Sequence, residues 1–381
     1  MKTKNKVLIK RIDEYDLEKI LAFFKRSLLH KDSVLPRLVN KTILLKPNLL
    51  GAYAPERAVT THPVILEAVI QILQTIDCKI LIGDSPGGAL NYDLVLEKCG
   101  IQELASKYNV EIVNLNKYKV LNTNNSGYSI AYTQLYEEVD YIINLAKYKT
   151  HSLMQFTGAV KNLYGLVPGL KKADYHREYP NSQKFAQFLT KLYETVKGKV
   201  LFSVIDGIVG MEGKGPSGGN PRNFGYLFVS ECPSSLDYVA ASMMGFKALD
   251  IDLIRLTMQA DGVLPSRIAS NFLWQENIIP NVDIGVVKLR NRILNKIPNS
   301  ISTIFQAFFW YKPVITDRCK KCNICFNSCP VNAIKIDDEG NLKIDDKLCI
   351  RCLCCHEFCP HQAIEIRKSS FANKIIPQAN N

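Results

Sequence analysis

The sequence lacks the long apolar runs and the export signal that mark membrane and secreted proteins. No uninterrupted apolar stretch approaches the roughly 20 residues that a membrane-spanning helix needs. Residues 1–10 contain several lysines, but no apolar run of the length found in a signal peptide follows them. We therefore expect a cytoplasmic protein without a membrane span.

Basic residues are in excess, but blocks of them are absent. The 381 residues include 48 Lys and Arg against 36 Asp and Glu, which gives a formal net charge of +12. No run of Lys and Arg is longer than two residues, so the dense patches of many nucleic-acid-binding segments are missing. The charge favours acidic partners or anionic substrates, and we expect no nucleic acid as a partner.

Cysteine is scarce in most of the chain and dense near its end. Three of the twelve cysteines are scattered through the first 312 residues, whereas nine lie between Cys319 and Cys359. In a chain without an export signal, such a cluster is more typical of metal binding than of a disulfide framework.

The clustered cysteines form two runs with one spacing. Residues 319–330 and residues 349–360 each have the pattern C-x2-C-x2-C-x3-C-P. In bacterial two-cluster ferredoxins with this pattern, the fourth cysteine of each run ligates the other cluster. We therefore predict two 4Fe-4S clusters as cofactors. The predicted ligands are Cys319, Cys322, Cys325 and Cys359 for one cluster, and Cys349, Cys352, Cys355 and Cys329 for the other.

The repeat extends beyond the cysteines. Residues 330–336 resemble residues 360–366, and residues 341–345 have the pattern of a strand that leads into the second half. A pair of structural zinc sites is the alternative, but it would leave the third cysteine of each run and the prolines without a role. Cys354 is one position out of register, so we expect it to be a non-ligand, with tuning of a cluster potential or alternative ligation left open.

Before residue 313 the chain alternates between strand and helix patterns. Strands are predicted over residues 7–12, 42–45, 79–82, 110–115, 141–145, 201–205 and 226–229. Helices are predicted over residues 17–29, 63–76 and 92–108, and after His151. This alternation indicates an α/β domain with a doubly wound, mainly parallel sheet, followed by a small α+β ferredoxin-like 4Fe-4S domain. The predicted boundaries are 1–290 for the α/β domain, 291–312 for a linker, 313–368 for the ferredoxin domain and 369–381 for a tail.

The predicted linker is rich in aromatic and basic residues. Two interpretations follow from residues 290–312: a linker that packs its aromatic side chains between the two domains, or a segment that lies on a membrane surface. Pro298 and Pro313 interrupt the segment and favour the linker.

Unusual polar residues follow the predicted strands. Ligands of doubly wound sheets bind at the carboxyl ends of the strands, so these residues indicate an anion pocket with acid/base chemistry. The candidate catalytic residues are Lys147, Lys149, His151, Lys161, Asp84 and Asp206. The alternative is a solvated basic surface, with His151 as a helix cap and His176 in an exposed loop.

Several longer motifs resemble a known family. They are Lys46-Pro-Asn48, Gly83-Asp-Ser-Pro-Gly87, Lys147-Tyr-Lys-Thr-His151, Gly158-Ala-Val-Lys161-Asn162, Gly165-Leu-Val-Pro-Gly169 and Ile205-Asp-Gly-Ile-Val-Gly-Met-Glu-Gly-Lys-Gly-Pro216. Residues 7–245 are similar to the family called domain of unknown function 362, which often has a ferredoxin module behind it. The resemblance implies an iron–sulfur protein but no particular reaction. The sequence around Asp237 departs from the family's usual Asp-Pro-Val-Ala segment, which puts a role for Asp237 in question.

Two functions follow from these patterns. In the first, the clusters pass electrons to or from a small anionic substrate bound by the α/β domain, which makes the protein an oxidoreductase. In the second, the protein is a non-catalytic ferredoxin-type carrier whose large domain docks a redox partner. An electron donor or acceptor protein is expected in both. A catalytic pocket requires Lys147, Lys149, His151 and Lys161 to converge near a cluster, whereas a docking domain would present a flat charged face.

Overall fold

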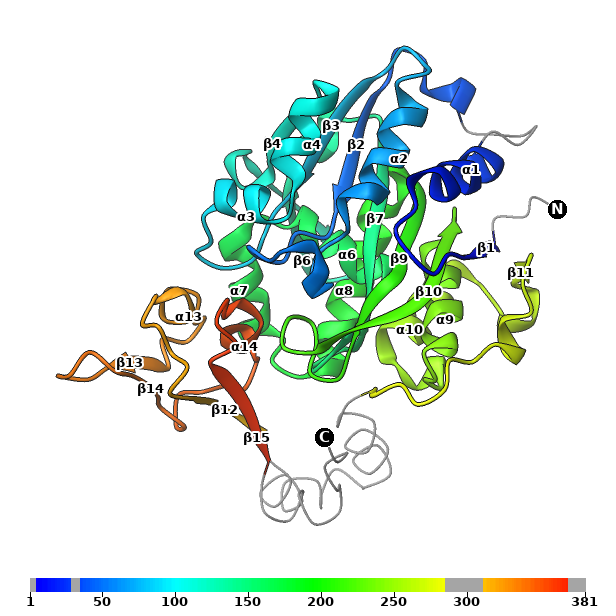
Figure 1. The fold of residues 1–381 in the computed structure, drawn as a ribbon. Helices are drawn as coiled ribbons and strands as arrows, with labels where there is room; N and C mark the ends of the chain where they lie inside the picture. The colour runs from blue at the N-terminus through cyan, green and yellow to red at the C-terminus, as the bar shows by residue number, and fades with distance from the viewer. Residues whose placement is uncertain (1–4, 29–34, 285–310, 369–381) are drawn as a thin grey trace.

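A nine-stranded sheet forms the centre of the larger domain in the computed structural model, which describes residues 5–28, 35–284 and 311–368 (Figure 1). The strand order is β11-β1-β10-β9-β7-β2-β3-β4, and the short β8 pairs with β7. The strands are β1 (Lys6–Arg11), β2 (Thr42–Pro47), β3 (Lys79–Asp84), β4 (Glu111–Asn114), β7 (Tyr141–His151), β8 (Gln155–Thr157), β9 (Val200–Glu212), β10 (Asn220–Ser230) and β11 (Ala269–Ser270).

Most neighbouring strands run parallel. The strands β4, β3, β2, β7 and β9 are parallel to one another, while β10 pairs antiparallel with β9 and β1 pairs antiparallel with β10. This arrangement confirms the predicted fold class. The first strand of the chain therefore lies far from the second, on the antiparallel side of the sheet.

Helices cover both faces of the sheet, because the central strands bury side chains on both sides. In β2, Ile43 and Leu45 pack into one core and Leu44 packs into the other. The first core contains α1 (Leu17–Leu28), α2 (Pro63–Leu73), α3 (Tyr92–Lys98) and α4 (Ile101–Tyr108). The opposite face is covered by α6 (Ala159–Asn162), α7 (Gly169–Glu178), α8 (Ser182–Val196), α9 (Pro233–Met243) and α10 (Asp252–Asp261). In the described ranges, no helix has both the length and the hydropathy of a membrane span.

Three local expectations differ from the structure. The single helix predicted over 92–108 is broken between α3 and α4, where Gly100 has a φ of 72° that ends the first helix. The strand predicted to end at 145 continues as β7 to His151 and turns into β8, so a hairpin precedes the expected helix. The third difference is the hairpin of β5 (Val120–Asn125) and β6 (Tyr128–Thr133), where no strands were predicted.

The C-terminal module is built from two similar halves. The strand β12 (Tyr311–Ile315) pairs with β15 (Ile364–Lys368), and β13 (Ile334–Ile336) pairs with β14 (Leu342–Ile344), which lies within the predicted strand 341–345. Short helices α13 (Ile324–Asn327) and α14 (Cys354–Phe358) occupy equivalent places. Positive φ angles recur thirty residues apart, at Lys321 and Arg351, Asn323 and Leu353, and Asn332 and Gln362. Residues 291–310 of the predicted linker and the tail 369–381 lie outside the described residues.

The module docks on the α/β domain mainly through its second half, while Ser328 of the first half accepts a hydrogen bond from the amide of Ala89 at 3.1 Å. In Figure 1, α14 lies beside the larger domain, whereas the β13–β14 hairpin points away from it. The Tyr53 hydroxyl donates a hydrogen bond to the carbonyl of Cys359 at 3.1 Å, and the Ser217 hydroxyl donates one to the carbonyl of Glu357 at 2.9 Å. The second half of the module is therefore fixed against loops of the α/β domain.

Close packing at Gly87 generates the first testable prediction. A Cβ atom at this position would lie 2.4 Å from Cζ of the buried Phe358 on α14. We expect Gly87→Ala to loosen the docking, because the ring or the helix must move. The measurement is hydrogen exchange of the amides in α14, which should become faster.

The matched control for this change is Gly198→Ala. No atom lies within 4 Å of a Cβ built at Gly198, so this variant should exchange like the unchanged protein. Equal exchange of α14 in both variants would contradict the docking seen here.

Candidate functional site

Each half of the module encloses a cavity lined by cysteines. One cavity contains Cys319, Cys322, Cys325 and Cys359 in its lining. The other contains Cys329, Cys349, Cys352 and Cys355, with Cys354 beside them. The fourth cysteine of each run thus lies with the first three of the other run, as crossed ligation requires.

The donor set of each cavity fits a 4Fe-4S cluster. Four thiols surround each cavity, although within residues 5–28, 35–284 and 311–368 no three His, Cys, Asp or Glu side chains are close enough to share one metal ion. Backbone amides of Ala333 and Ala363 donate to Sγ of Cys329 and Cys359 at 3.2 and 3.3 Å. Such bonds stabilise thiolates and tune cluster potentials.

Thiol chemistry links cluster binding to proton release. Burial, followed by the neighbouring Cys359, raises the pKa of Cys325 to about 11. A thiolate is the form that ligates metal, so binding a cluster must remove these protons. When bound, a 4Fe-4S cluster supplies one-electron transfer.

Two buried ion pairs lie at the carboxyl ends of the parallel strands. Lys46 Nζ is 2.8 Å from Asp84 Oδ1, and Lys147 Nζ is 2.7 Å from Asp206 Oδ2, with all four side chains buried. The Tyr15 hydroxyl donates a further hydrogen bond to Asp206 at 2.9 Å. Both predicted aspartates are thus paired with lysines, and an acid/base role for either remains a prediction.

Lys149 is buried, and among the described residues no carboxylate accepts a hydrogen bond from it. Its Nζ donates to Oδ1 of Asn48 at 2.8 Å and to the carbonyl of Val59 at 2.6 Å. Burial, followed by the charges of Lys161 and Lys147, lowers the pKa of Lys149 well below its usual range. The hydrogen-bond acceptors of Lys149 are thus neutral, whereas Lys46 and Lys147 face aspartates.

His151 reaches the iron–sulfur module. Its Nδ1 accepts hydrogen bonds from the amides of Leu153 and Met154 at 3.1 and 3.3 Å, so the neutral ring carries its proton on Nε2. Nε2 lies 3.3 Å from Oε1 of Glu357 on α14, but the two atoms are misaligned and neither forms a hydrogen bond within the described residues. Burial and then Lys161 lower the pKa of His151 well below its usual range.

Two side chains that the sequence analysis did not assign to the site join it from α7. Lys172 donates to the carbonyl and hydroxyl of Ser85, and burial lowers the pKa of Lys172 to about 7. His176 is buried and stacks on Phe185 with ring centroids 4.4 Å apart, so the alternative of an exposed loop is wrong. The i, i+4 spacing of Lys172 and His176 is the signal for a shared helix face. Lys171 instead lies exposed on the surface.

Asp237 has a structural role that positions Lys161. Its carboxylate accepts the backbone N–H groups of Ala159 and Val160 at 2.5 and 3.0 Å and so fixes α6, which carries Lys161. Burial raises the pKa of Asp237 to about 7. A Cβ atom at Gly158 would lie 2.2 Å from Asp237 Oδ1, so glycine is needed there.

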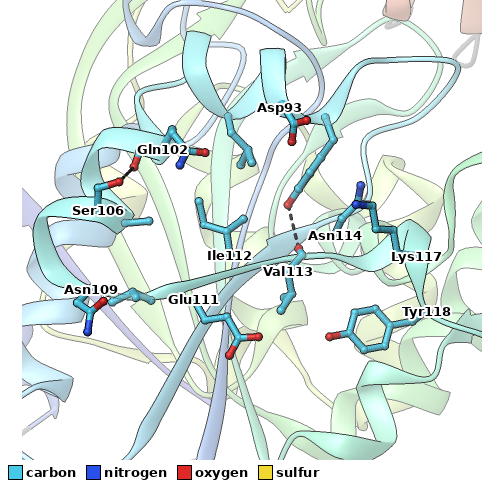
Figure 2. Close-up of a pocket in the computed structure, with 14 residues that line it drawn as sticks. Asp93, Gln102, Ser106, Asn109, Glu111, Ile112, Val113, Asn114, Lys117 and Tyr118 are labelled. Carbon is cyan, nitrogen blue, oxygen red and sulfur yellow. Dashed lines mark hydrogen bonds between the residues drawn. The ribbon is translucent and has the colours of Figure 1, made fainter.

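A groove of about 690 Å³ lies away from these residues. It is bounded by α3, α4 and β4, and Figure 2 shows Asp93, Glu111 and Lys117 along it. None of the predicted site residues lines this groove. The chemistry-bearing side chains gather instead where α14 meets the strand ends.

The glycine-rich loop between β9 and β10 contacts the iron–sulfur module. Gly213, Gly215 and Gly218 match the G-x-G-x-x-G spacing of dinucleotide-binding loops, but this loop joins two antiparallel strands and opens no helix. It docks α14 instead, through Ser217.

Lys172 gives a prediction for the dependence of stability on pH. Its folded-state pKa of about 7 lies below the usual value of about 10.4, so between these values only the unfolded chain holds the proton. The free energy of unfolding of the wild-type protein, minus that of Lys172→Met, should therefore rise with pH from 7 to 10, by about 1.4 kcal/mol per pH unit. Below pH 7 the full burial penalty is present.

The measurement is scanning calorimetry of both proteins at one scan rate under anaerobic conditions. The exposed Lys171 supplies the control, because Lys171→Met should show a difference from wild type that does not change with pH. A pH-independent difference for Lys172→Met would show that the amine keeps an ordinary affinity for protons.

Comparison with known proteins identifies two regions of the chain. A model of a 4Fe-4S dicluster domain matches residues 318–363. The thylakoid-associated protein sll1697 of Synechocystis sp. is 33% identical over 205 residues, which are 53% of this chain and 62% of that protein. Pyruvate synthase subunit PorD of Methanocaldococcus jannaschii is 39% identical over 56 residues, which are 14% of this chain and 65% of that subunit. This chain thus spans less than two thirds of the length of either relative.

Solved structures are more distant. A Thermotoga maritima protein has a TM-score of 0.42 and 12% identity, covering 66% of this chain and 60% of its own. The lactate racemase apoprotein of Thermoanaerobacterium thermosaccharolyticum has a TM-score of 0.37 and 16% identity, covering 58% and 53%. Likeness at this level carries no argument about function. The family model described as domain of unknown function (DUF362), by contrast, matches residues 43–242, which is more than half of the chain. The chain therefore belongs to the DUF362 family and carries a 4Fe-4S dicluster domain behind the family's α/β region.

Proposed function

We propose that the protein is an iron–sulfur oxidoreductase that passes electrons between two 4Fe-4S clusters and a small anionic substrate at the α/β domain. Iron–sulfur electron transfer itself rests on the matched 4Fe-4S dicluster domain. The observation that carries the substrate role is the position of Glu357, which reaches from the second half of the module to 3.3 Å from His151 among the buried lysines.

The two cavities differ in how exposed their cysteines are, which indicates a path for electrons through the module. Cys322 in the first cavity is exposed, whereas Cys352 in the second is buried in an apolar cluster with Cys354 and Phe358, against which Leu50 of the α/β domain packs. A protein partner would exchange electrons at the exposed cluster. The second cluster, held by the predicted set with Cys352, would exchange them with the substrate.

The α/β domain would bind and orient the substrate. Lys149 and Lys161 present amines whose ammonium form a bound anion would favour, and the neutral His151 offers its Nε2–H as a hydrogen-bond donor. The ion pairs of Lys46 and Lys147 keep the strand ends rigid around them. Fixed donors in an enclosure from which water is excluded interact more strongly with developing charge than they would in water.

A carrier that only docks a partner through its large domain is less well supported. Docking of that kind uses exposed charges, but the side chains of Lys147, Lys149 and His151 are buried. A cytoplasmic location fits the proposal, because a reducing compartment protects cluster thiolates from oxidation.

The cofactor content is the first test. Protein purified without oxygen should contain about eight iron and eight acid-labile sulfide atoms per chain. Cys349→Ser removes a predicted ligand and should lower iron to about four per chain. Cys354→Ser is the matched control, because Cys354 is predicted to be a non-ligand, and it should keep all the iron. Zinc in place of iron would contradict the proposal.

Electron exchange between the clusters and a small molecule needs a separate experiment. Dithionite-reduced protein is mixed with the low-molecular-mass fraction or the protein fraction of an extract of the host cell, and the visible absorbance of the clusters is followed. We expect the small-molecule fraction to reoxidise the clusters of the wild-type protein. With His151→Phe, most of this reoxidation should be lost. Reoxidation by the protein fraction alone, equal in both proteins, would indicate a carrier.

A further inference from the structure

We propose that Lys161, His151, His176 and Thr157 bind the carboxylate or phosphate group of a small molecule in the interface beneath α14. The proposal names the ligand class and the binding residues of the site described above. Only the identification of this ligand as a redox substrate rests on the proposed function, because the binding argument stands on unpaired groups and charge.

Several buried polar atoms in this interface have no hydrogen-bond partner among the described residues. They are Nε2 of His151, Nδ1 of His176, Oγ1 of Thr157 and Oε1 of Glu357. Each belongs to a side chain that is more than nine-tenths buried. Leaving a buried polar group unpaired is unfavourable. Nε2 of His151 and Oε1 of Glu357 lie 3.3 Å apart and face each other, so it is the atoms of His176 and Thr157, together with the Nε2–H of His151, that indicate a missing partner.

These atoms come from elements that meet at one place. Thr157 is in register with Lys149 on β7, so it lies on the same face of the sheet as Lys149 and His151. The charges of Lys161 and Lys172 act on His176, and the charge of Lys161 also acts on His151. The helix α6, fixed by Asp237, holds Lys161 next to them.

The charge balance favours an anion over a cation. Lys46 and Lys147 are paired with Asp84 and Asp206, whereas the charges of Lys161 and Lys149 act on the carboxyl group of Glu357. Burial lowers the pKa of both Lys149 and Lys161, because a buried ammonium without a counter-charge is unfavourable. An oxyanion would favour their ammonium forms and accept hydrogen bonds from the orphaned donors, whereas a metal cation would be repelled by them.

Lys161 is the accessible member of the group. Its side chain is partly exposed, while those of His151, His176 and Glu357 are buried. Within the described part of the chain, its ammonium donates no hydrogen bond. An anion can therefore enter along Lys161 and gain a charge-assisted hydrogen bond that no protein group now takes.

Glu357 occupies the position beside His151 that the carboxylate of a ligand would take. Its Oε1 faces Nε2–H of His151 at 3.3 Å without the alignment of a hydrogen bond. We interpret it as an internal competitor: its carboxyl group lies against the Nε2–H that a ligand would use, and in its ionised form it would repel an incoming anion. Removing that charge while keeping the shape should strengthen anion binding.

The buried lysines have a second explanation, which the experiment must distinguish from the binding of a small anion. A 4Fe-4S cluster with four thiolates is an anion, so Lys161 beside Cys354 could serve only to balance the charge of the second cluster. In that case Lys161→Met would shift the cluster potential, and added anions would not bind.

The experiment is isothermal titration calorimetry of the cluster-loaded full chain with sodium phosphate and, separately, sodium acetate as probes. We expect at least one probe to bind and Lys161→Met to weaken it about tenfold, the effect of one charge-assisted hydrogen bond. Lys171→Met is the matched control, since Lys171 is exposed and pairs with Asp174 at 3.4 Å, and it should leave the affinity unchanged.

A second variant covers the case in which Lys161→Met loses iron or fails to fold. Glu357→Gln should bind the same probe severalfold more tightly, because the competing charge is gone. Binding of phosphate alone would assign a phosphate-bearing ligand, and binding of acetate alone would assign a carboxylate.

Failure to bind either probe in both the wild-type protein and Glu357→Gln would overturn the inference. That result together with small-molecule reoxidation of the clusters would leave the proposed function standing. Anion binding without any reoxidation would keep the site and reject the redox role.

Discussion

The burial of lysines at the strand ends is the constraint on which the rest of the structure depends. A buried ammonium is unfavourable unless it is paired or hydrogen-bonded. The chain satisfies this requirement with aspartates for Lys46 and Lys147, and with an amide and a carbonyl oxygen for Lys149. The carboxyl ends of β2, β3, β7 and β9 are therefore tied together by polar side chains. For Lys161 the described residues of the α/β domain offer no such partner.

The iron–sulfur module completes this polar cluster. It brings Glu357 to His151 and close to Lys161 and Lys149, and glycine at positions 87 and 218 allows α14 to approach closely. At Gly218 a Cβ atom would lie 2.9 Å from Cε1 of His356. The helix that carries Cys355, a predicted ligand of the second cluster, thus forms one wall of the polar interface. Electron transfer and anion binding would share a single enclosed region.

Much of this arrangement could be predicted from local patterns. Cysteine spacing predicted the four thiols around each of two cavities: three follow from the loop geometry of one run, and the fourth comes from the other run, as in two-cluster ferredoxins. Alternating strands and helices gave the parallel sheet, and polar residues after each strand indicated its functional edge. The motif departure at Asp237 led to doubt about its role, but the carboxylate proved to fix α6 by accepting two backbone amides.

The sequence by itself determined the cofactor type, the fold class and the edge of the sheet at which polar residues gather. Only the tertiary structure decided that Asp84 and Asp206 are neutralised by lysines, that Lys172 and His176 join from α7, and that Glu357 faces His151. The physical reason is sequence separation: His151 and Glu357 are brought together by the docking of two domains. Hydrophobic periodicity and motif spacing describe neighbours along one element, and they contain no information about such a contact.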